Sequence, residues 1–371
     1  MHQKKTQLQE FMISENIDVI YLDNPNTVAY FTGFESNPHE RIVAYILTQK
    51  DDFLFVPTLE KEEAMQRSNV ETVYSYNDSE DPWKIIAQEV SKLIDKKIDS
   101  YCIDETTMTV ERDNKLRHAF LDIHKNTITT NDISSVIEQM RLVKTEDEIE
   151  KMIASGKLAD EALQIGIDSL VEGITEQEVA AIIDMEMKKK GVSEMSFSTL
   201  VLFGDHAASP HGNPGERQLK PNELVLFDLG VIYNGYASDV TRTVAFGEVN
   251  KKEKEVYDIV LEAQRTAQAA VKPGMRAGEL DIIARQVIEN AGYGEYFTHR
   301  LGHGIGKTAH EFPSINAEND TILEPGMCFS IEPGIYIAGE VGVRIEDCVY
   351  VTEDGCEPFT FMDKELYTII K

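Results

Sequence analysis

The sequence predicts an α+β protein with two domains, in which a small α/β domain precedes a larger domain. Its 371 residues are enough for two domains. Apolar, β-branched runs alternate with helical patterns in the first third of the chain, whereas later strands and helices occur in groups. We therefore expect domains at residues 1–133 and 134–371, with the join within 133–145.

The elements of the first domain follow from apolar runs separated by turn-forming residues. Strands are expected at residues 17–23, 41–48 and 52–58. Helices are expected at residues 62–68 and 81–97. Asp81 and Pro82 suit the start of the second helix, because an aspartate caps free amides and a proline needs no amide donor there.

The second domain opens with a stretch whose latter part, residues 145–170, has helical periodicity. Thr145 and Glu148 have the spacing of a capping box at its start. The elements expected next are a helix at 175–191, strands within 197–204 and 223–247, helices at 250–271 and 277–290, and mostly strand from 320 onward. Gly292 fits the end of the last helix, since glycine readily takes the left-handed conformation common there.

The charge balance argues against nucleic acid and anionic membrane surfaces as partners. The chain has 36 basic and 65 acidic residues, a net charge of −29, which phosphate groups would repel. It has no apolar run near the roughly 18 residues of a membrane span, and the first residues lack the apolar part of a signal peptide. The cysteines at 102, 328, 348 and 356 form no CxxC pair. We expect a cytoplasmic protein with reduced thiols.

Two aspartates lie on a predicted hairpin. Asn234-Gly235 between alternating apolar runs is a strong two-residue turn pattern, which pairs Tyr233 with Tyr236. In that register Asp239 lies opposite Gly230, and Asp228 and Asp239 share a face as diagonal neighbours roughly 7–8 Å apart at Cα. Glycine at 230 would leave room there. Carboxylates so placed could bracket two metal ions, although turn chemistry and a surface aspartate would explain the same pattern.

Two glutamates lie on a second predicted strand–turn–strand segment. Glu332 and Glu346 are fourteen residues apart, each in an apolar context. A connection with an odd number of residues, such as 338–340, makes them face each other, whereas an even one puts them on opposite faces. A pair of surface acids with Arg344 as ion-pair partner is the alternative explanation.

A histidine between glycines completes a possible metal site. In the stretch HRLGHGIGKTAHE, Gly302 and Gly304 let the backbone at His303 enter a crowded centre without a Cβ clash. Four carboxylates and a neutral imidazole carry −4, which two divalent cations neutralise, whereas one would leave costly buried charge. Oxygen-rich ligands with one histidine favour Mn²⁺ or Co²⁺, with Zn²⁺ also possible.

At this point the chain resembles the pita-bread metallopeptidases, in the branch of prolidase (Xaa-Pro dipeptidase) and aminopeptidase P. The motifs FDLG, SDVTRT, HRLGHGIGKTAHE, SIEPG and VGVRIED occur together and in order over residues 134–371. The first domain is similar to the family's N-terminal domain only in size and general pattern. The resemblance implies five metal ligands: Asp228, Asp239, His303, Glu332 and Glu346. Their presence disfavours relatives that have lost their metals, and methionine aminopeptidases usually lack the leading domain.

Further site residues are implied by the same resemblance. His310 matches a substrate-contacting histidine, and His211 matches one near the scissile bond. Arg344 and Tyr336 match a pair that orients ligands and closes the site, with Tyr336 also a substrate-side residue. Phe197 is a candidate wall of the proline pocket.

The implied activity is hydrolysis of the Xaa-Pro bond of dipeptides ending in proline, through a hydroxide that bridges both ions, with Glu332 as general base. One departure concerns selectivity: Ser314 stands where some prolidases carry an arginine suited to a product carboxylate. The alternatives are aminopeptidase P, a hydrolase of small non-peptide solutes, and a non-catalytic binding module. Resemblance alone suggests a homodimer.

Overall fold

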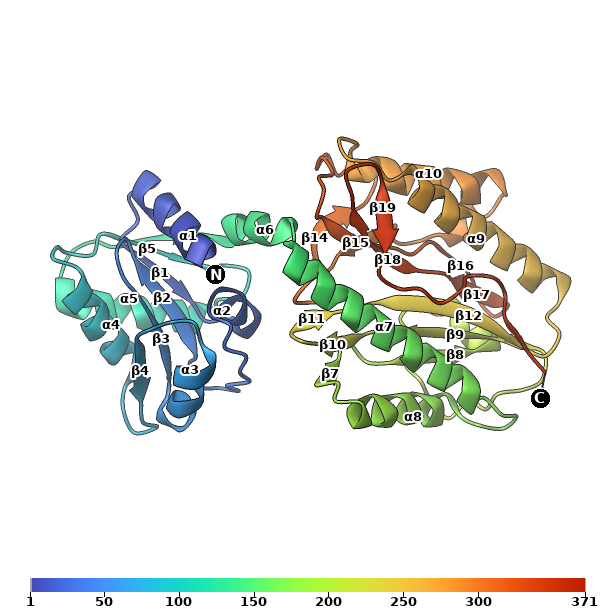
Figure 1. Cartoon of the computed structure of the whole chain (residues 1–371), viewed down its shortest axis with the longest axis horizontal. Coiled ribbons are helices and arrows are strands. Elements are labelled where there is room, and N and C mark those ends of the chain that lie inside the picture. Colours follow the sequence, from blue (N-terminus) through green and yellow to red (C-terminus); the bar gives the residue numbers. More distant parts are fainter. Residues whose placement is uncertain (1, 371) are drawn as a thin grey trace. The chain divides into compact units, whose positions relative to one another are not determined.

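The structure, a computed structural model, describes residues 2–370 and separates the chain into two compact units after Met140 (Figure 1). The boundary expected from the sequence lies at the start of α6, Ser134–Leu142, so the two divisions differ by most of that helix. None of the helices in the described chain combines the length and apolar composition that crossing a membrane requires.

The first unit is a six-stranded mixed sheet with helices on both faces. Its strand order is β4-β3-β2-β1-β5-β6. The strands are β1 Val19–Leu22, β2 Ala44–Thr48, β3 Asp52–Pro57, β4 Val73–Tyr76, β5 Ser100–Ile103 and β6 Thr129–Asp132. The helices are α1 His2–Ser14, α2 Pro25–Thr32, η1 Thr58–Glu60, α3 Lys61–Arg67, α4 Pro82–Leu93 and α5 Val110–His124.

Two apolar clusters fill the faces of this sheet. Side chains of α1, α2, α3 and α6 form one cluster, and side chains of α4 and α5 form the other. The predicted helix start at Asp81 is confirmed, because its carboxylate accepts from the amides of Trp83 and Lys84, with Pro82 at the first helical position. Helices α1, α2 and α5 were not among the elements expected from the sequence.

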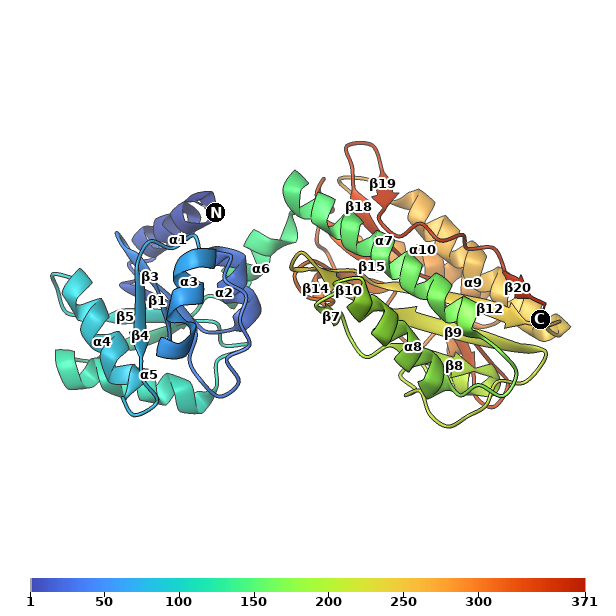
Figure 2. The same cartoon turned by 60° about the horizontal axis from the view of Figure 1, so that its bottom comes forward.

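The second unit places short sheets between two pairs of helices (Figures 1 and 2). The helices are α7 Glu146–Ser169, α8 Glu176–Lys189, η2 Gly204–Ala208, α9 Lys251–Ala270, α10 Ala277–Asn290 and η3 Gly294–Tyr296. The first strands are β7 Glu194–Met195, β8 Leu200–Phe203, β9 Glu223–Leu229, β10 Val231–Tyr233, β11 Tyr236–Ala237 and β12 Val240–Phe246. The later strands are β13 Gly302–Gly304, β14 Glu311–Ile315, β15 Cys328–Ile331, β16 Gly334–Ile337, β17 Val341–Arg344, β18 Asp347–Val351, β19 Cys356–Pro358 and β20 Thr368–Ile369.

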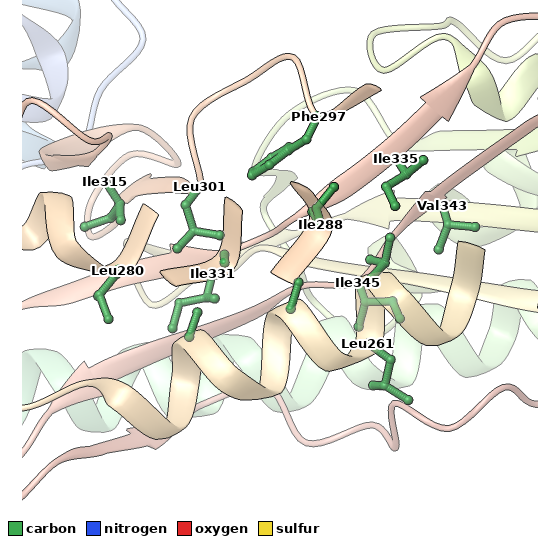
Figure 3. Close-up of a cluster of buried hydrophobic side chains, with 14 of the residues drawn as sticks. Leu261, Leu280, Ile288, Phe297, Leu301, Ile315, Ile331, Ile335, Val343 and Ile345 are labelled. Carbon is green, nitrogen blue, oxygen red and sulfur yellow. The ribbon is translucent and has the colours of Figure 1, made fainter. Parts of the chain in front are cut away.

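The helix pairs cover different strands. Helices α7 and α8 pack on β8, β9 and β12, whereas α9 and α10 pack on β15 to β18. Figure 3 shows the second of these clusters, in which Leu261 and Ile288 from the helices lie beside Ile331, Ile335 and Ile345 from the strand segments. Because both helix pairs lie outside the strands, polar side chains on the inner strand faces can meet in the middle. The predicted α+β class is therefore confirmed.

Local sequence patterns explain where the elements of this unit begin and turn. The capping box of Thr145 and Glu148 is present at the start of α7. Asn234 and Gly235 have positive φ values of 51° and 73°, as a tight two-residue hairpin turn requires. Gly292, with φ 87°, follows the end of α10. Strands β13 and β14, which carry or adjoin candidate histidines, were not expected, because their glycines and proline mask a strand pattern.

Candidate metal centre

The aspartate hairpin has the register expected from its turn. Tyr233 pairs with Tyr236 across β10 and β11, and Asp228 pairs with Thr241 across β9 and β12. One register connects both strand pairs, so Asp228 and Asp239 lie on the same face of the hairpin. The structure gives Gly230 a different role from the expected one: a Cβ there would overlap the carbonyl oxygen of Ser238. Glycine is needed for the close approach of the partner strand.

The two glutamates also have the required parity. Strands β16 and β17 are joined by the three residues 338–340, and Gly334 pairs with Arg344. On the other side of the glutamates, Ile331 of β15 pairs with Asp347 of β18 in the same register. Glu332 and Glu346 therefore lie directly opposite each other, where the two strand pairs meet.

His303 enters this centre from β13. A Cβ at Gly302 would overlap the carbonyl oxygen of Ser330, and one at Gly304 would overlap that of Phe312, so only glycines allow this packing. The Nδ1 of His303 donates to its neighbour's carbonyl, Gly304 O, at 3.1 Å. The Nε2 lone pair then faces the carboxylates, 3.2 Å from Glu332 Oε1 and 3.7 Å from Asp239 Oδ2.

Several carboxylate oxygens in the centre are buried without a hydrogen-bond donor among the described residues. They are Asp228 Oδ1, Asp239 Oδ1 and Glu346 Oε1. Burial and the charge of Glu346 raise the pKa of Asp239 well above its usual range, and burial and Glu332 do the same to the pKa of Glu346. Ligand atoms of Asp239, His303 and Glu346 lie within 4.8 Å of one another. This concentration of unpaired negative charge fits divalent cations.

A second layer of hydrogen bonds fixes the carboxylates in place. Arg344 is buried, contacts Asp228 Oδ2 with one amino group and donates from Nε to Thr241 Oγ1 at 3.2 Å. Thr241 donates to Glu346 Oε2 at 2.7 Å. On the other side, the Ser330 hydroxyl donates to Glu332 Oε1 at 3.0 Å. These bonds hold Asp228 Oδ2, Glu346 Oε2 and Glu332 Oε1, whereas Asp228 Oδ1 and Glu346 Oε1 have no donor among the described residues.

All five expected ligands line one cavity of about 550 Å³, together with Phe197, His211, His310 and Arg344. The rings of His303 and His310 lie edge to face, with centroids 4.1 Å apart. Burial, together with neighbouring His303 and Arg300, lowers the pKa of His310 to about 4, so its imidazole is neutral at pH 7. His211 is exposed and Phe197 is half-buried.

Tyr336 does not belong to the cavity wall formed by the described residues. Its hydroxyl accepts from Arg344 Nη1 at 2.9 Å and donates to His299 Nε2 at 2.9 Å, because His299 Nδ1 already donates to the Arg300 carbonyl. The expected ligand-orienting role fits this position better than direct contact with a substrate. His299 lies in the histidine- and glycine-rich stretch, but no role was predicted for it.

Arg300 was also missed, although it adjoins His299. It lines the cavity and donates from Nη1 to Ser314 Oγ at 3.0 Å. Ser314 is the residue at which a departure from some prolidases is expected from the sequence. Arg300, in the segment before β13, thus places a guanidinium on the cavity wall, where Ser314 holds it.

Comparisons with known proteins agree with this geometry. Residues 150–353 match the model of Metallopeptidase family M24, and residues 4–143 match the Creatinase/Prolidase N-terminal domain. The chain belongs to metallopeptidase family M24. An Xaa-Pro dipeptidase of Lactobacillus helveticus is 49% identical to it over 365 residues, which are 98% of each chain. The predicted membership of the prolidase group and the predicted pita-bread fold are confirmed.

Solved structures of similar proteins cover nearly the whole chain. The prolidase from Pyrococcus horikoshii OT3 superposes with a TM-score of 0.90 and 35% identity, covering 98% of this chain and 99% of its own. An X-Pro aminopeptidase from Thermotoga maritima MSB8 has a TM-score of 0.87 and 31% identity, covering 95% of this chain and 98% of its own. M24 membership makes this chain a metallopeptidase of that fold, and the two solved structures are named as different enzymes, a prolidase and an X-Pro aminopeptidase.

Proposed function

We propose that this protein hydrolyses the Xaa-Pro bond of dipeptides with a dinuclear metal centre. The observation that carries the assignment is the meeting of four carboxylates, of which Asp239 and Glu346 are buried, and one imidazole in a cavity that also contains His310 and Arg300. The similarity to the L. helveticus Xaa-Pro dipeptidase over 98% of both chains supports the substrate class.

The proposed ligands are the five residues Asp228, Asp239, His303, Glu332 and Glu346. Their net charge of −4 is balanced by two divalent ions, and the oxygen-rich set favours Mn²⁺ over Co²⁺ or Zn²⁺. When bound, such ions polarise a carbonyl oxygen and lower the pKa of water. Arg344 and Thr241 keep Asp228 and Glu346 oriented for this purpose.

The remaining groups provide proton transfer and binding. Glu332 accepts the proton of the attacking water, and His310 and His211 donate hydrogen bonds to the carbonyl oxygen or pass a proton to the leaving nitrogen. The prolyl nitrogen has no N–H group and its ring fixes φ, so extended-strand recognition by ordinary proteases fails. Phe197 supplies apolar wall for the proline ring.

Arg300 supports the dipeptide preference. A dipeptide ends in a carboxylate one residue after the scissile bond, and a guanidinium binds a carboxylate with paired, charge-assisted hydrogen bonds. Arg300 lies on the cavity wall, held by Ser314. A longer peptide has no charge at this position and gains no such contact.

We further propose a cytoplasmic homodimer. All four cysteines are free thiols, which suits a reducing compartment. The homodimer follows from the family resemblance, and sedimentation analysis of the purified protein tests it. A sedimentation coefficient of a monomer at micromolar concentration would contradict it.

The activity is tested with metal-free protein refilled with Mn²⁺, Co²⁺ or Zn²⁺ and assayed on Ala-Pro, Leu-Pro and Ala-Pro-Ala. Dipeptide hydrolysis that depends on added metal, with slow cleavage of the tripeptide, is expected. Equal rates on tripeptide and dipeptides would indicate an aminopeptidase P instead. If the protein bound metal but turned over none of the three peptides, a non-peptide substrate would be indicated. If it bound no metal, a non-catalytic binding module would be indicated.

A further inference from the structure

The loop that carries His211 has no strand or α-helix of its own to fix it beside the cavity. It connects β8 to β9, and its residues 210–214 line the cavity wall. His211 itself is exposed. The position of its imidazole therefore depends on how the two ends of the loop are held.

Glu176 holds the chain on both sides of the cavity-lining residues 210–214. It is the first residue of α8 and is fully buried. Its carboxylate accepts from the Phe203 amide at 2.8 Å, before the cavity-lining residues 210–214, and from the Gly215 amide at 3.0 Å, directly after them. It also accepts from Nδ1 of His206, inside the loop, at 2.8 and 2.9 Å to its two oxygens.

The backbone at the start of α8 adds two more bonds to the loop. The Glu176 amide donates to Arg217 O at 3.2 Å, and the Gln177 amide donates to Gly215 O at 3.2 Å. These are amides of a first helical turn, which have no partner within the helix. The loop thus satisfies the helix end while the helix end fixes the loop.

The chemistry at this position requires a carboxylate. Three donors converge on its two oxygens, and the positive end of the α8 dipole favours the negative charge. A glutamine has one acceptor oxygen and an amide group that donates, so it would leave at least one buried donor without a partner. Loss of one such bond shifts the loop without removing any group from the cavity.

We propose that Glu176 and His206 are positioning residues that set the place of His211 beside the metal centre. Neither residue lines the cavity. Their role presupposes the Xaa-Pro activity proposed above. A displacement of about 1 Å in a group that orients the substrate can cost up to about 100-fold in rate. The pair therefore controls turnover through the loop.

The test compares E176Q with the control E178Q. Glu178 is an exposed glutamate two residues further along the same helix, and its carboxylate accepts from the Thr175 amide. E176Q is expected to lower kcat/KM for Ala-Pro by about tenfold or more, with Mn²⁺ affinity unchanged, whereas E178Q keeps wild-type kinetics. H206A should act like E176Q, and H206N should recover activity, since the asparagine amide can donate in place of Nδ1.

A double mutant separates positioning from general destabilisation. If Glu176 acts through His211, E176Q lowers kcat/KM in the wild type but has little further effect in H211A. Additive losses, or wild-type kinetics in E176Q and H206A, would overturn the assignment.

Hydrogen exchange gives a readout that does not depend on catalysis. Amides 203–217 should exchange faster in E176Q and H206A than in E178Q, while those of β9 and β12 stay unchanged. If the wild type turned over no Xaa-Pro peptide, the proposed function would fail, but the exchange pattern would still decide whether the pair holds the loop. Unchanged exchange at 203–217 would overturn the inference.

Discussion

Glu332 and Glu346 lie directly opposite each other at the junction of two antiparallel strand pairs. The β16–β17 hairpin and the β15–β18 pair share one register, so both glutamates extend from the same face of the junction. The backbone thus brings two carboxylates together. This arrangement is costly unless the charge is neutralised, which is the physical basis of the metal assignment.

Replacement of Asp239 by asparagine should abolish turnover while the fold persists. Asp239 is buried with Oδ1 lacking a donor, and an amide group there would direct hydrogens at the cation site. We expect a loss of kcat greater than the roughly 10–100-fold typical of outer-shell residues. Steady-state kinetics and circular dichroism measure the two properties. The exposed Asp258 on α9 provides a matched D258N control. Activity retained in D239N would contradict its role as a ligand.

The side-chain pairs of this centre could be placed from the sequence because strand parity decides which residues share a face. The Asn234-Gly235 turn determines the register of the hairpin that carries Asp228 and Asp239. For the segment with Glu332 and Glu346, a connection with an odd number of residues follows only if the two glutamates are assumed to meet. The three-residue turn was one of the allowed possibilities and could not be chosen without the structure. The ligand roles themselves came from the family resemblance.

Other contacts between distant segments could not be predicted from the residues, and the pairing of Arg344 with Tyr336 came only from the family resemblance. Arg344 reaches Asp228 and Tyr336, and Tyr336 reaches His299, through packing that leaves no periodic pattern in the chain. Arg300 was missed because its partner Ser314 belongs to a strand hidden by its proline. The one available indication was that His299 and Arg300 lie in a glycine-rich stretch close to the predicted ligand His303.

Replacement of Arg344 by lysine should weaken metal binding. A lysine keeps the charge but cannot bond simultaneously to Asp228, Thr241 and Tyr336 in the planar arrangement of a guanidinium. We expect Mn²⁺ affinity to fall by about 10–100-fold. Competition with a fluorescent chelator measures the change. R265K, at an exposed arginine of α9, should bind Mn²⁺ like the wild type. Equal affinities in R344K and R265K would be inconsistent with the orienting role of Arg344.

Replacement of Gly302 by alanine should displace His303. The added Cβ would overlap the backbone carbonyl of Ser330, which belongs to β15 and has little freedom to move. Overpacking of this kind costs about 1–3 kcal/mol, so thermal stability and metal affinity should both fall. G355A is the control, because the nearest atom to its Cβ is Val271 O at 3.5 Å. If G302A bound Mn²⁺ as well as G355A, the close approach would have no bearing on the site.

Glu311 should give the second unit a measurable dependence of stability on pH. Its side chain is 6% exposed, 2.5 Å from Arg141 Nη2 and 3.4 Å from Lys144 Nζ. Burial alone would raise the pKa of Glu311, but Lys144 and Arg141 outweigh it, and the pKa is lowered. Glu311 directly follows His310 and begins β14, so its ion pairs also hold the chain beside this cavity residue.

The sign of the effect follows from the lowered pKa. A carboxyl whose pKa is lower in the folded than in the unfolded state stabilises the fold at pH values above its unfolded pKa, which is about 4.3 for glutamate. This contribution is lost as the pH falls through the pKa of the folded state. E311Q leaves buried Lys144 without its partner, which at pH 7 should cost about 3–5 kcal/mol. Thermal unfolding of metal-free wild type and E311Q should therefore differ most at neutral pH and approach each other as the pH falls from about 4.3 through the lowered pKa of Glu311. The control is E353Q, which changes an exposed glutamate, and its difference from the wild type should show no such dependence on pH. If the difference in stability between the wild type and E311Q stayed constant on acidification, Glu311 would act by packing and not by charge.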